Sequence, residues 1–137
     1  MNYKEDGRKK DVIINSMHDG LLSIDREGKI DLLNSSAEKI LKISKKEAIG
    51  KDVKEIIPDT KIHEVLIKGE PEVNQIQHVW ENTIITNRVP VKDNAGNTIG
   101  VVAVFRNITD VKKLAENITN LREIQSMLKA IINSTQD

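Results

Sequence analysis

The stretch TIGVVAVFRNITD, residues 98–110, is the part of the chain that decides the fold. Its apolar part, Ile99 to Phe105, is almost continuous and rich in β-branched residues, which is typical of a central strand buried on both faces. Polarity returns at Arg106. Thr109 and Asp110 then supply helix-start chemistry: a side chain that accepts from a free backbone N–H, and an acid at the positive end of the helix dipole. The sequence therefore predicts a buried strand that hands over directly to an exposed helix.

Composition limits what the chain does. It has 137 residues, 38% of them hydrophobic, which is enough for one domain with a core and an extension. Basic and acidic residues number 21 each, so no net charge attracts nucleic acid or an anionic membrane, and we expect neither partner. Cysteine is absent, which excludes disulfides and cysteine-ligated metal and fits a cytoplasmic location. Because no apolar run approaches the roughly 18 residues that span a bilayer, we expect a soluble protein.

Turn and helix-start signals set the order of the elements. Turns at Asp25–Gly28 and Asp93–Gly96 predict two hairpins, LLSID with KIDLLN and TNRVPVK with TIGVVAVF. Between them, a capping residue followed by Glu three positions on predicts three helix starts: Ser35 with Glu38, Ser44 with Glu47, and Asp52 with Glu55.

The middle of the chain adds one helix and two strands. A helix is predicted over Lys61–Lys68, and strands over Glu72–Trp80 and Asn82–Val91. Pro90 cannot donate to a sheet ladder, so it indicates a local sheet edge or a bulge. The expected order is two strands, several short helices and three antiparallel strands.

The C-terminal segment has a seven-residue apolar repeat. The apolar residues at its a and d positions are Val111, Leu114, Ile118, Leu121, Leu128 and Ile132. Gln125 occupies the remaining a position. Such a helix packs either on its own domain or on a second chain as a parallel coiled coil, and the heptad spacing favours the second. We therefore expect a homodimer formed through the apolar surfaces of the N-terminal and C-terminal helices.

A short repeat links the two ends of the chain. Ile13–Asp19 returns as Ile131–Asp137 with five of seven positions identical, at an offset of 118 residues. We expect a second copy of the domain to begin there. Residues 110–137 would then be an amphipathic connector between domains.

The order of elements and several motifs resemble the PAS domain, a bacterial sensory module, over about residues 10–110. The motifs are Asn34 at the end of the second strand, Ala48–Lys51 before the third helix, and Val89–Val91 followed by Gly96–Gly100. Phe105–Thr109 looks like the family's Asp-Ile-Thr exit signature, with Asn107 in place of Asp. The resemblance implies an α+β PAS fold, a five-stranded antiparallel sheet with short helices on one face. Its parts are a docking helix (residues 1–18), the core (19–109) and the connector helix (110–137).

The resemblance also implies a regulatory domain that senses or relays a signal and dimerises. The segment EIQSMLKAIINSTQD is similar to connectors between tandem PAS domains in sigma-54-dependent transcription activators, so the leading interpretation is control of a transcription-activating effector. The alternatives are the sensor domain of a histidine kinase and a purely structural dimerisation module. Neither a phosphate-binding loop nor a paired-His metal helix occurs, so we expect no enzyme activity within the chain.

Candidate site residues fall into a pocket and a junction. A cavity between sheet and helices would be lined by Leu22, Ile24, Ile40, Leu66 and Phe105, residues that otherwise are simply core. Arg88 either points inward, where it would hold a carboxylate or phosphate, or lies on the sheet surface paired with Glu70 or Glu81. The rarity of buried Arg favours the surface. We expect Asn107, Thr109 and Asp110 to form the junction that passes the signal to the helix.

Cofactors are disfavoured. The resemblance implies that a haem-binding PAS domain would take an axial His from the helix that corresponds to Lys61–Lys68. In this chain His63 is expected to project away from the buried face formed by Ile62, Val65 and Leu66. The flavin photochemistry of the light-sensing branch needs a cysteine, and Phe105 stands where that branch carries a flavin-contacting Gln. We expect no haem, flavin or metal, and the sequence leaves open whether an unidentified small molecule binds.

Overall fold

The computed structural model describes residues 3–134. The chain divides into two compact units, one ending at Asn107 and one beginning at Ile108, and each is described by itself. The elements are α1 (Tyr3–Ser16), β1 (Gly20–Asp25), β2 (Ile30–Leu33), α2 (Ser35–Leu41), α3 (Lys45–Ala48), α4 (Val53–Ile56), α5 (Ile62–Lys68), β3 (Glu72–Val79), β4 (Asn82–Lys92), β5 (Thr98–Asn107) and α6 (Thr109–Ser134).

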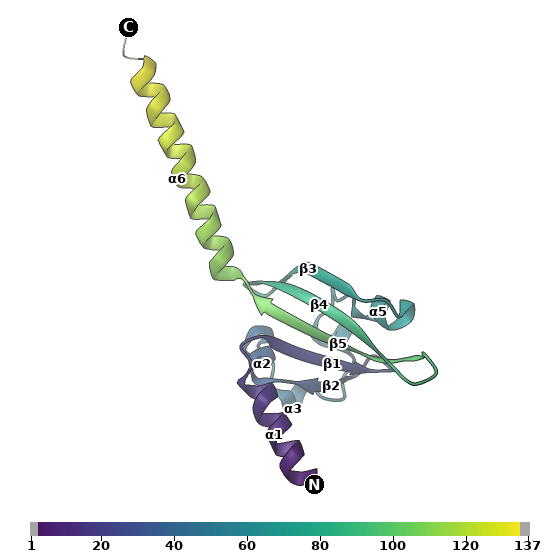
Figure 1. Ribbon diagram of the computed structural model, residues 1–137. Coiled ribbons are helices and arrows are strands. Elements are labelled where there is room, and N and C mark those ends of the chain that lie inside the picture. The colour runs from purple at the N-terminus through teal and green to yellow at the C-terminus, as the bar shows by residue number, and fades with distance from the viewer. Residues whose placement is uncertain (1–2, 135–137) are drawn as a thin grey trace. The chain divides into compact units, whose positions relative to one another are not determined.

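The first unit is built on a five-stranded antiparallel sheet in the order β2-β1-β5-β4-β3, with the predicted strand β5 at its centre (Figure 1). Burial along β5 alternates, however: Val101, Ala103 and Phe105 are buried, while Val102 and Val104 are half-buried. The expectation of a strand buried on both faces is therefore wrong. The helices α2, α3 and α5 pack on the sheet through the alternate residues of one face, as in an antiparallel sheet with one covered side.

The two predicted hairpin turns share one chemistry. Gly28 and Gly96 take φ of +82° and +86°, values that a side chain would strain. In the first turn the Asp25 carboxylate accepts from the backbone N–H of Glu27 (2.9 Å) and Lys29 (3.0 Å). In the second, Asp93 accepts from Ala95 (3.0 Å) and Asn97 (2.9 Å).

Helix starts follow the predicted caps in two cases out of three. Ser44 accepts from the N–H of Glu47 at the start of α3, and Asp52 accepts from Lys54 at the start of α4. The cap of α2 is Asn34 rather than the predicted Ser35. Asn34 has the extended backbone of a cap residue, and its side chain accepts from Ala37 N at 2.9 Å.

Pro90 lies at a local sheet edge, as predicted. The β3–β4 ladder ends with the pair Glu72 and Arg88, so Pro90 lies beyond the end of β3 and needs no donor on that side. On its other side Pro90 pairs with Val101 of β5.

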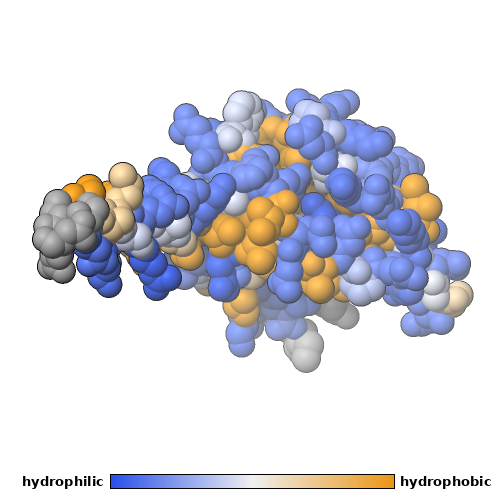
Figure 2. Space-filling model, turned by 90° about the horizontal axis from the view of Figure 1, so that it is seen from above, coloured by the Kyte–Doolittle hydropathy of each residue, from blue (hydrophilic) through white to orange (hydrophobic). Residues whose placement is uncertain are grey.

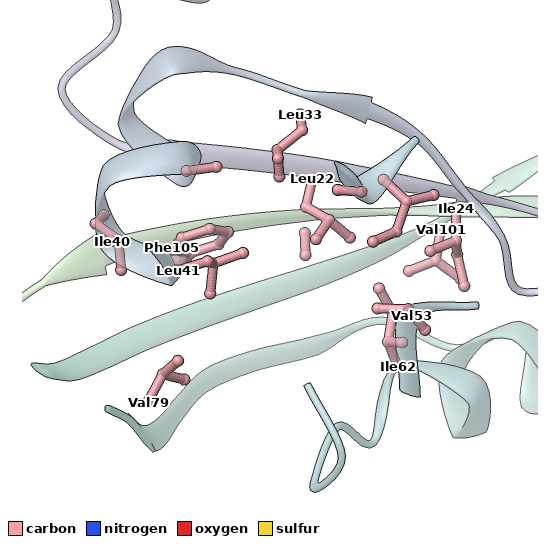
Figure 3. Packing of buried hydrophobic residues seen from close by; sticks show 14 of the residues in the cluster. Leu22, Ile24, Leu33, Ile40, Leu41, Val53, Ile62, Val79, Val101 and Phe105 are labelled. Carbon is pink, nitrogen blue, oxygen red and sulfur yellow. The ribbon is translucent and has the colours of Figure 1, made fainter. Parts of the chain in front are cut away.

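The core lies between the covered sheet face and the short helices. Figure 3 shows Leu22 of β1 and Phe105 of β5 beside Leu41 of α2, with Val53 of α4 and Ile62 of α5 gathered next to each other. The buried apolar cluster comprises Leu22, Ile24, Ile30, Leu33, Ala37, Ile40, Leu41, Ala48, Val53, Ile62, Val65, Val79, Ile84, Val101, Ala103 and Phe105.

The helix α1 docks through polar groups at its C-terminal end. Asn34 donates to the carbonyl oxygens of Ile14 and Asp19, both at 3.0 Å, and Asn15 accepts from Ser35 at 3.1 Å. Its apolar residues Val12 and Ile13 remain 61% and 56% exposed. Hydrogen bonds therefore hold the C-terminal end of this helix, while Val12 and Ile13 remain open to solvent.

Up to residue 134, the second unit consists of the helix α6, 26 residues long. The apolar residues at its a and d positions are all exposed, between 45% for Ile118 and 67% for Val111. Figure 2 shows apolar side chains reaching an otherwise mostly hydrophilic surface. Residues 135–137 of the predicted repeat lie outside the described part of the chain. No helix within residues 3–134 has the length and apolarity to cross a membrane.

Candidate ligand pocket

A small cavity lies in the core between sheet and helices. The space between its lining atoms is about 310 Å³, part of which is open to solvent. We call it the core cavity, and it is lined by Leu22, Leu41, Val53, Ile57, Thr60, Ile62, Gln77, Ile84, Thr86, Arg88, Ala103 and Phe105. Most of the lining is apolar with a few polar groups, the usual make-up of a small-molecule site.

The residues proposed from sequence divide into two groups. Leu22, Arg88 and Phe105 line the core cavity. Ile24 and Ile40 are buried in the core and Leu66 packs against it, but none of the three is among the lining residues.

Arg88 points inward, contrary to the favoured surface placement. The residue is only 4% exposed. Its Nη1 donates to Glu72 Oε2 at 2.9 Å and its Nη2 to Gln77 Oε1 at 3.2 Å. Glu72, not Glu70 or Glu81, is its ion-pair partner. Residues of β4 at 84, 86 and 88 share the covered face because side chains alternate along a strand.

An irregularity in β3 brings the partner into place. The ladder pairs Gln75 with Thr86 and Glu72 with Arg88, so β3 uses one extra residue between these two pairs. At this bulge Asn74 has φ of +55°, and its N–H donates to Asn87 Oδ1 at 2.8 Å. Regular pairing would set Val73 opposite Arg88. The bulge therefore exchanges an apolar side chain for a carboxylate beside the guanidinium.

Thr86 supplies a second polar group inside the cavity. It is 3% exposed, and its Oγ1 has no hydrogen-bond partner among the described residues. A buried hydroxyl without a partner is costly, so such groups often mark a binding position.

Phe105 forms one end of the cavity because Gly20 makes room for it. Gly20 is the cross-strand partner of Phe105, and a Cβ at Gly20 would overlap the Phe105 ring. The glycine at the start of β1 therefore leaves the space that the Phe105 ring occupies.

His63 lies outside the core cavity. Its Nε2 is 3.6 Å from Asp52 Oδ1 and packs over Gly28, where an added Cβ would lie 2.5 Å from it. The side chain is 21% exposed and its Nδ1 is buried without a partner among the described residues. His63 thus joins α5, the α4 cap and the first hairpin turn. That haem is absent stays a prediction.

The junction residues lie at the end of one unit and the start of the next along the chain. Asn107 ends β5, and its Nδ2 donates to Asn82 Oδ1 at 3.3 Å. The carbonyl of Ile108 accepts from Lys112 N at 2.8 Å, so Ile108 holds the N-cap position of α6 and Thr109 is the first helical residue. Asp110 lies in the first turn, where an acid complements the helix dipole.

Two charged groups of the first unit have shifted pKa values. The Asn97 backbone N–H, donating to the Asp93 carboxylate, lowers the pKa of Asp93 below its usual value. The hydrogen bond to Asp19 raises the pKa of Arg106. This pair joins Nε to Oδ1 at 3.1 Å on the solvent side of the sheet. Within the described residues, no three His, Asp or Glu side chains gather as metal ligands would.

Sequence reasoning missed several residues of the site. Thr86 lies two residues before Arg88 in the same strand, so both side chains lie on the same face of the sheet. The inward direction of Thr86 therefore follows once Arg88 is known to point inward. Glu72 gave no such signal, because the face on which it lies depends on the bulge between Glu72 and Gln75. Gln77 gave none because β3 has too few apolar residues to show which face is covered. Thr60 lies in an irregular segment before α5, where no periodicity applies.

Comparisons with known proteins agree with this geometry. The sequence profile of the PAS fold family matches residues 8–108. A PAS domain from Colwellia psychrerythraea superposes with a TM-score of 0.59 at 18% identity, covering 75% of this chain and 97% of that one. The PAS domain of BvgS from Bordetella pertussis gives a TM-score of 0.56 at 20% identity, covering 86% and 98%.

Curated relatives include sensor kinases. The chain is 32% identical over 121 residues to a probable C4-dicarboxylate sensor kinase of Halalkalibacterium halodurans, covering 88% of this chain and 22% of the relative. It is 29% identical over 123 residues to the sensor protein CitS of Bacillus subtilis, covering 90% and 22%. The chain thus spans about a fifth of the length of these relatives. With its fold, its sheet order and the matched residues 8–108, the chain belongs to the PAS fold family as a sensory PAS domain.

Proposed function

We propose that this PAS domain binds a small molecule in the core cavity and passes the binding event to α6. The observation that carries the proposal is chain connectivity. Phe105 lines the cavity, and only three residues separate it from Thr109, where α6 begins. A ligand that shifts β5 therefore acts on the strand that leads into the helix. Such a shift changes output only if the ligand binds the two states of the domain differently.

The output proposed here is control of a histidine kinase. The relatives named above support this over control of a transcription-activating effector, because they are named as sensor kinases and sensor proteins. In the full-length protein the two outputs separate by assay. Autophosphorylation from ATP that responds to the ligand supports the kinase, whereas ligand-dependent transcription without phosphotransfer supports the activator.

The dimer is part of the same proposal. The exposed a and d residues of α6 form an apolar stripe that a second copy of the helix would cover as a parallel coiled coil. The exposed Val12 and Ile13 of α1 add apolar surface at the other end of the chain.

The compound after which one relative is named, a C4-dicarboxylate, does not fit this cavity well. A C4-dicarboxylate carries two negative charges, whereas Arg88 is the only charged residue among the described lining residues and is already paired with Glu72. We therefore expect a different ligand chemistry here.

Native mass spectrometry of the freshly purified chain tests whether it binds a ligand at all. We expect a mass increment that disappears on denaturation and that weakens when Ala103→Leu fills the cavity. A chain that carries no small molecule, and gains none from cell extract, would leave a structural dimerisation module as the function.

Transmission through the junction is tested by Thr109→Ala in the full-length protein. Thr109 is the first residue of α6 and not its predicted cap, so Thr109→Ala should cost less than the roughly 1 kcal/mol of a lost cap and the domain stays folded. We expect the output to become constant whatever the ligand state. Thr119→Ala, which removes a Thr hydroxyl bonded to Ala115 inside the same helix, is the matched control and should keep the response. A full response in Thr109→Ala would place the signal route elsewhere.

A further inference from the structure

We propose that the core cavity takes a small monocarboxylic acid with a compact apolar body, whose carboxylate replaces that of Glu72 on Arg88. The inference rests on the proposed ligand-binding function and adds the chemical class of the ligand and the exchange by which it binds.

The lining and the size of the cavity indicate that the ligand has a compact apolar body. Eight of the twelve lining residues are apolar, and the polar ones are Thr60, Gln77, Thr86 and Arg88. The room inside the cavity is small, since only about 20 Å³ is open to the centre of a water-sized sphere, so the ligand has few heavy atoms and the lining side chains move apart as it binds. One polar end and a branched or cyclic hydrocarbon part match this lining.

The buried charge of Arg88 indicates that the ligand carries an acid group. A guanidinium that is 4% exposed needs an anionic partner, because an unpaired buried charge is strongly destabilising. Arg also matches a carboxylate geometrically, with two parallel N–H donors. A monoanion in the place of Glu72 leaves the charge of the site unchanged. A dianion would add one negative charge for which the described lining residues offer no cation.

The partner that leaves is Glu72 rather than Arg88. The Glu72 side chain is 27% exposed and that of Arg88 is 5% exposed. Glu72 is also the first residue of the edge strand β3, next to the bulge at Asn74. Its carboxylate therefore reaches water by a side-chain rotation, whereas the guanidinium is enclosed between β3 and β5. In the ligand-free state Glu72 is a built-in competitor for the site.

Thr86 supplies the second contact. It lies two residues from Arg88 on the same strand face, and its Oγ1 lacks a partner among the described residues. The hydroxyl is free to donate to the second oxygen of the bound carboxylate. This contact would satisfy a group that the ligand-free cavity leaves buried and unbonded.

Isothermal titration of the purified chain tests the proposal with four probes: 3-methylbutanoate, its neutral amide, succinate and inorganic phosphate. We expect the monocarboxylate to bind at least about tenfold more tightly than the amide, the factor given by one charge-assisted bond. Succinate and phosphate should bind more weakly than the monocarboxylate.

Variants separate the roles of the three residues. Glu72→Gln removes the competitor, so the affinity for the acid should rise by about tenfold while that for the amide stays unchanged. Arg88→Gln should abolish binding of the acid, and Thr86→Val should weaken it several-fold. Matched controls are Glu70→Gln, an exposed glutamate two residues from Glu72, and Arg106→Gln, an arginine paired with Asp19 outside the cavity. Both should bind as wild type does.

Several results would overturn the inference. Equal affinity for acid and amide would show that Arg88 does not recognise the negative charge of the ligand. Ligand binding by the cavity would still stand. Tighter binding of succinate or phosphate would assign a different class of anion. Failure of the acid to bind either wild type or a folded Glu72→Gln variant would refute the exchange. The proposed function itself fails only if native mass spectrometry finds no small molecule on the chain and none gained from cell extract.

Discussion

At the scale of single residues, buried polar side chains decide how the elements of this domain are held together. Asn34 is 1% exposed and makes four hydrogen bonds. Its Oδ1 accepts from Leu21 and Ala37, and its Nδ2 donates to Ile14 and Asp19. One amide therefore joins the C-terminal part of α1, the start of β1 and the start of α2. The two buried threonines of β4 differ in this respect. The Thr83 hydroxyl lies within hydrogen-bond distance of His78, whereas the Thr86 hydroxyl has no partner among the described residues.

Replacing Asn34 should be among the most damaging single changes. Asn34→Ala leaves two N–H groups and two carbonyls without their partner, so the free energy of unfolding should fall by about 3 kcal/mol. Asn34→Asp should also destabilise, because it sets an anion beside two carbonyl oxygens. Chemical denaturation measures both. Asn94→Ala, at the exposed tip of the second hairpin turn, is the control, and an equal loss there would contradict the network.

The two buried threonines should respond in opposite ways. In the ligand-free chain Thr86→Val removes an unbonded hydroxyl from the core, so the unfolding free energy should stay level or rise by up to about 1 kcal/mol. Thr83 Oγ1 lies 3.2 Å from His78 Nδ1, so Thr83→Val should lower it by about 1 kcal/mol. Thermal melts of both variants make the comparison. A clear loss in Thr86→Val would mean that its hydroxyl already has a partner.

At the scale of elements, turns and caps carry local signals that act independently of the rest of the fold. Asp25 and Asp93 close their hairpins by accepting from backbone N–H groups two and four residues on. Gly28 and Gly96 complete the turns with positive φ. Because all these contacts lie within five residues, the sequence pattern is sufficient to form them.

Acid should weaken the second hairpin turn. Hydrogen bonding by the Asn97 N–H lowers the pKa of Asp93 in the folded state below the usual 3.8. A depressed carboxylate pKa contributes stability above the unfolded pKa, and that contribution is lost as pH falls through the folded pKa. Wild type should therefore melt above Asp93→Asn near neutral pH, and the gap should close on acidification from about pH 5 to below about pH 3. A gap that stays constant over that range would contradict the assignment.

At the scale of the whole molecule, the chain combines a sensory PAS unit with a helix whose apolar residues are exposed. The a and d stripe of α6 is extended by Ile124 and Ile131, which are 53% and 57% exposed. An apolar stripe along most of a 26-residue helix is a large surface to leave in water. A second copy of the same helix would cover it with matching spacing, which is why we propose a dimer as the working form.

Charges on that stripe should separate the protomers. Leu114→Glu with Leu121→Glu puts two like charges in each helix at d positions, so sedimentation should show a monomer whose sheet signal in circular dichroism is unchanged. The control is Asn120→Glu with Ser126→Glu, which adds the same charge to α6 off the a and d positions and should leave the dimer intact. Wild type sedimenting as a monomer at high concentration would refute the dimer.

The sequence by itself determined the elements and their order. Alternating apolar residues, Asp and Gly at the turns, and capping residues at Ser44 and Asp52 are local signals, and the strands and helices formed where these signals predicted them. The exit motif and Asn34 were sufficient to indicate the PAS fold, which the family match over residues 8–108 confirms.

Only the tertiary structure decided which side chains point into the cavity. Arg88 was favoured as a surface residue, yet it is buried because Glu72 lies opposite it, and Glu72 lies there only because β3 bulges at Asn74. A shift of one residue in a strand moves each side chain to the other face of the sheet, and nothing local in the sequence marks where the shift occurs. The partners of Asn34 are as far as 20 residues away along the chain. Register and long-range pairing depend on contacts between distant segments, and these contacts exist only once the whole sheet has assembled.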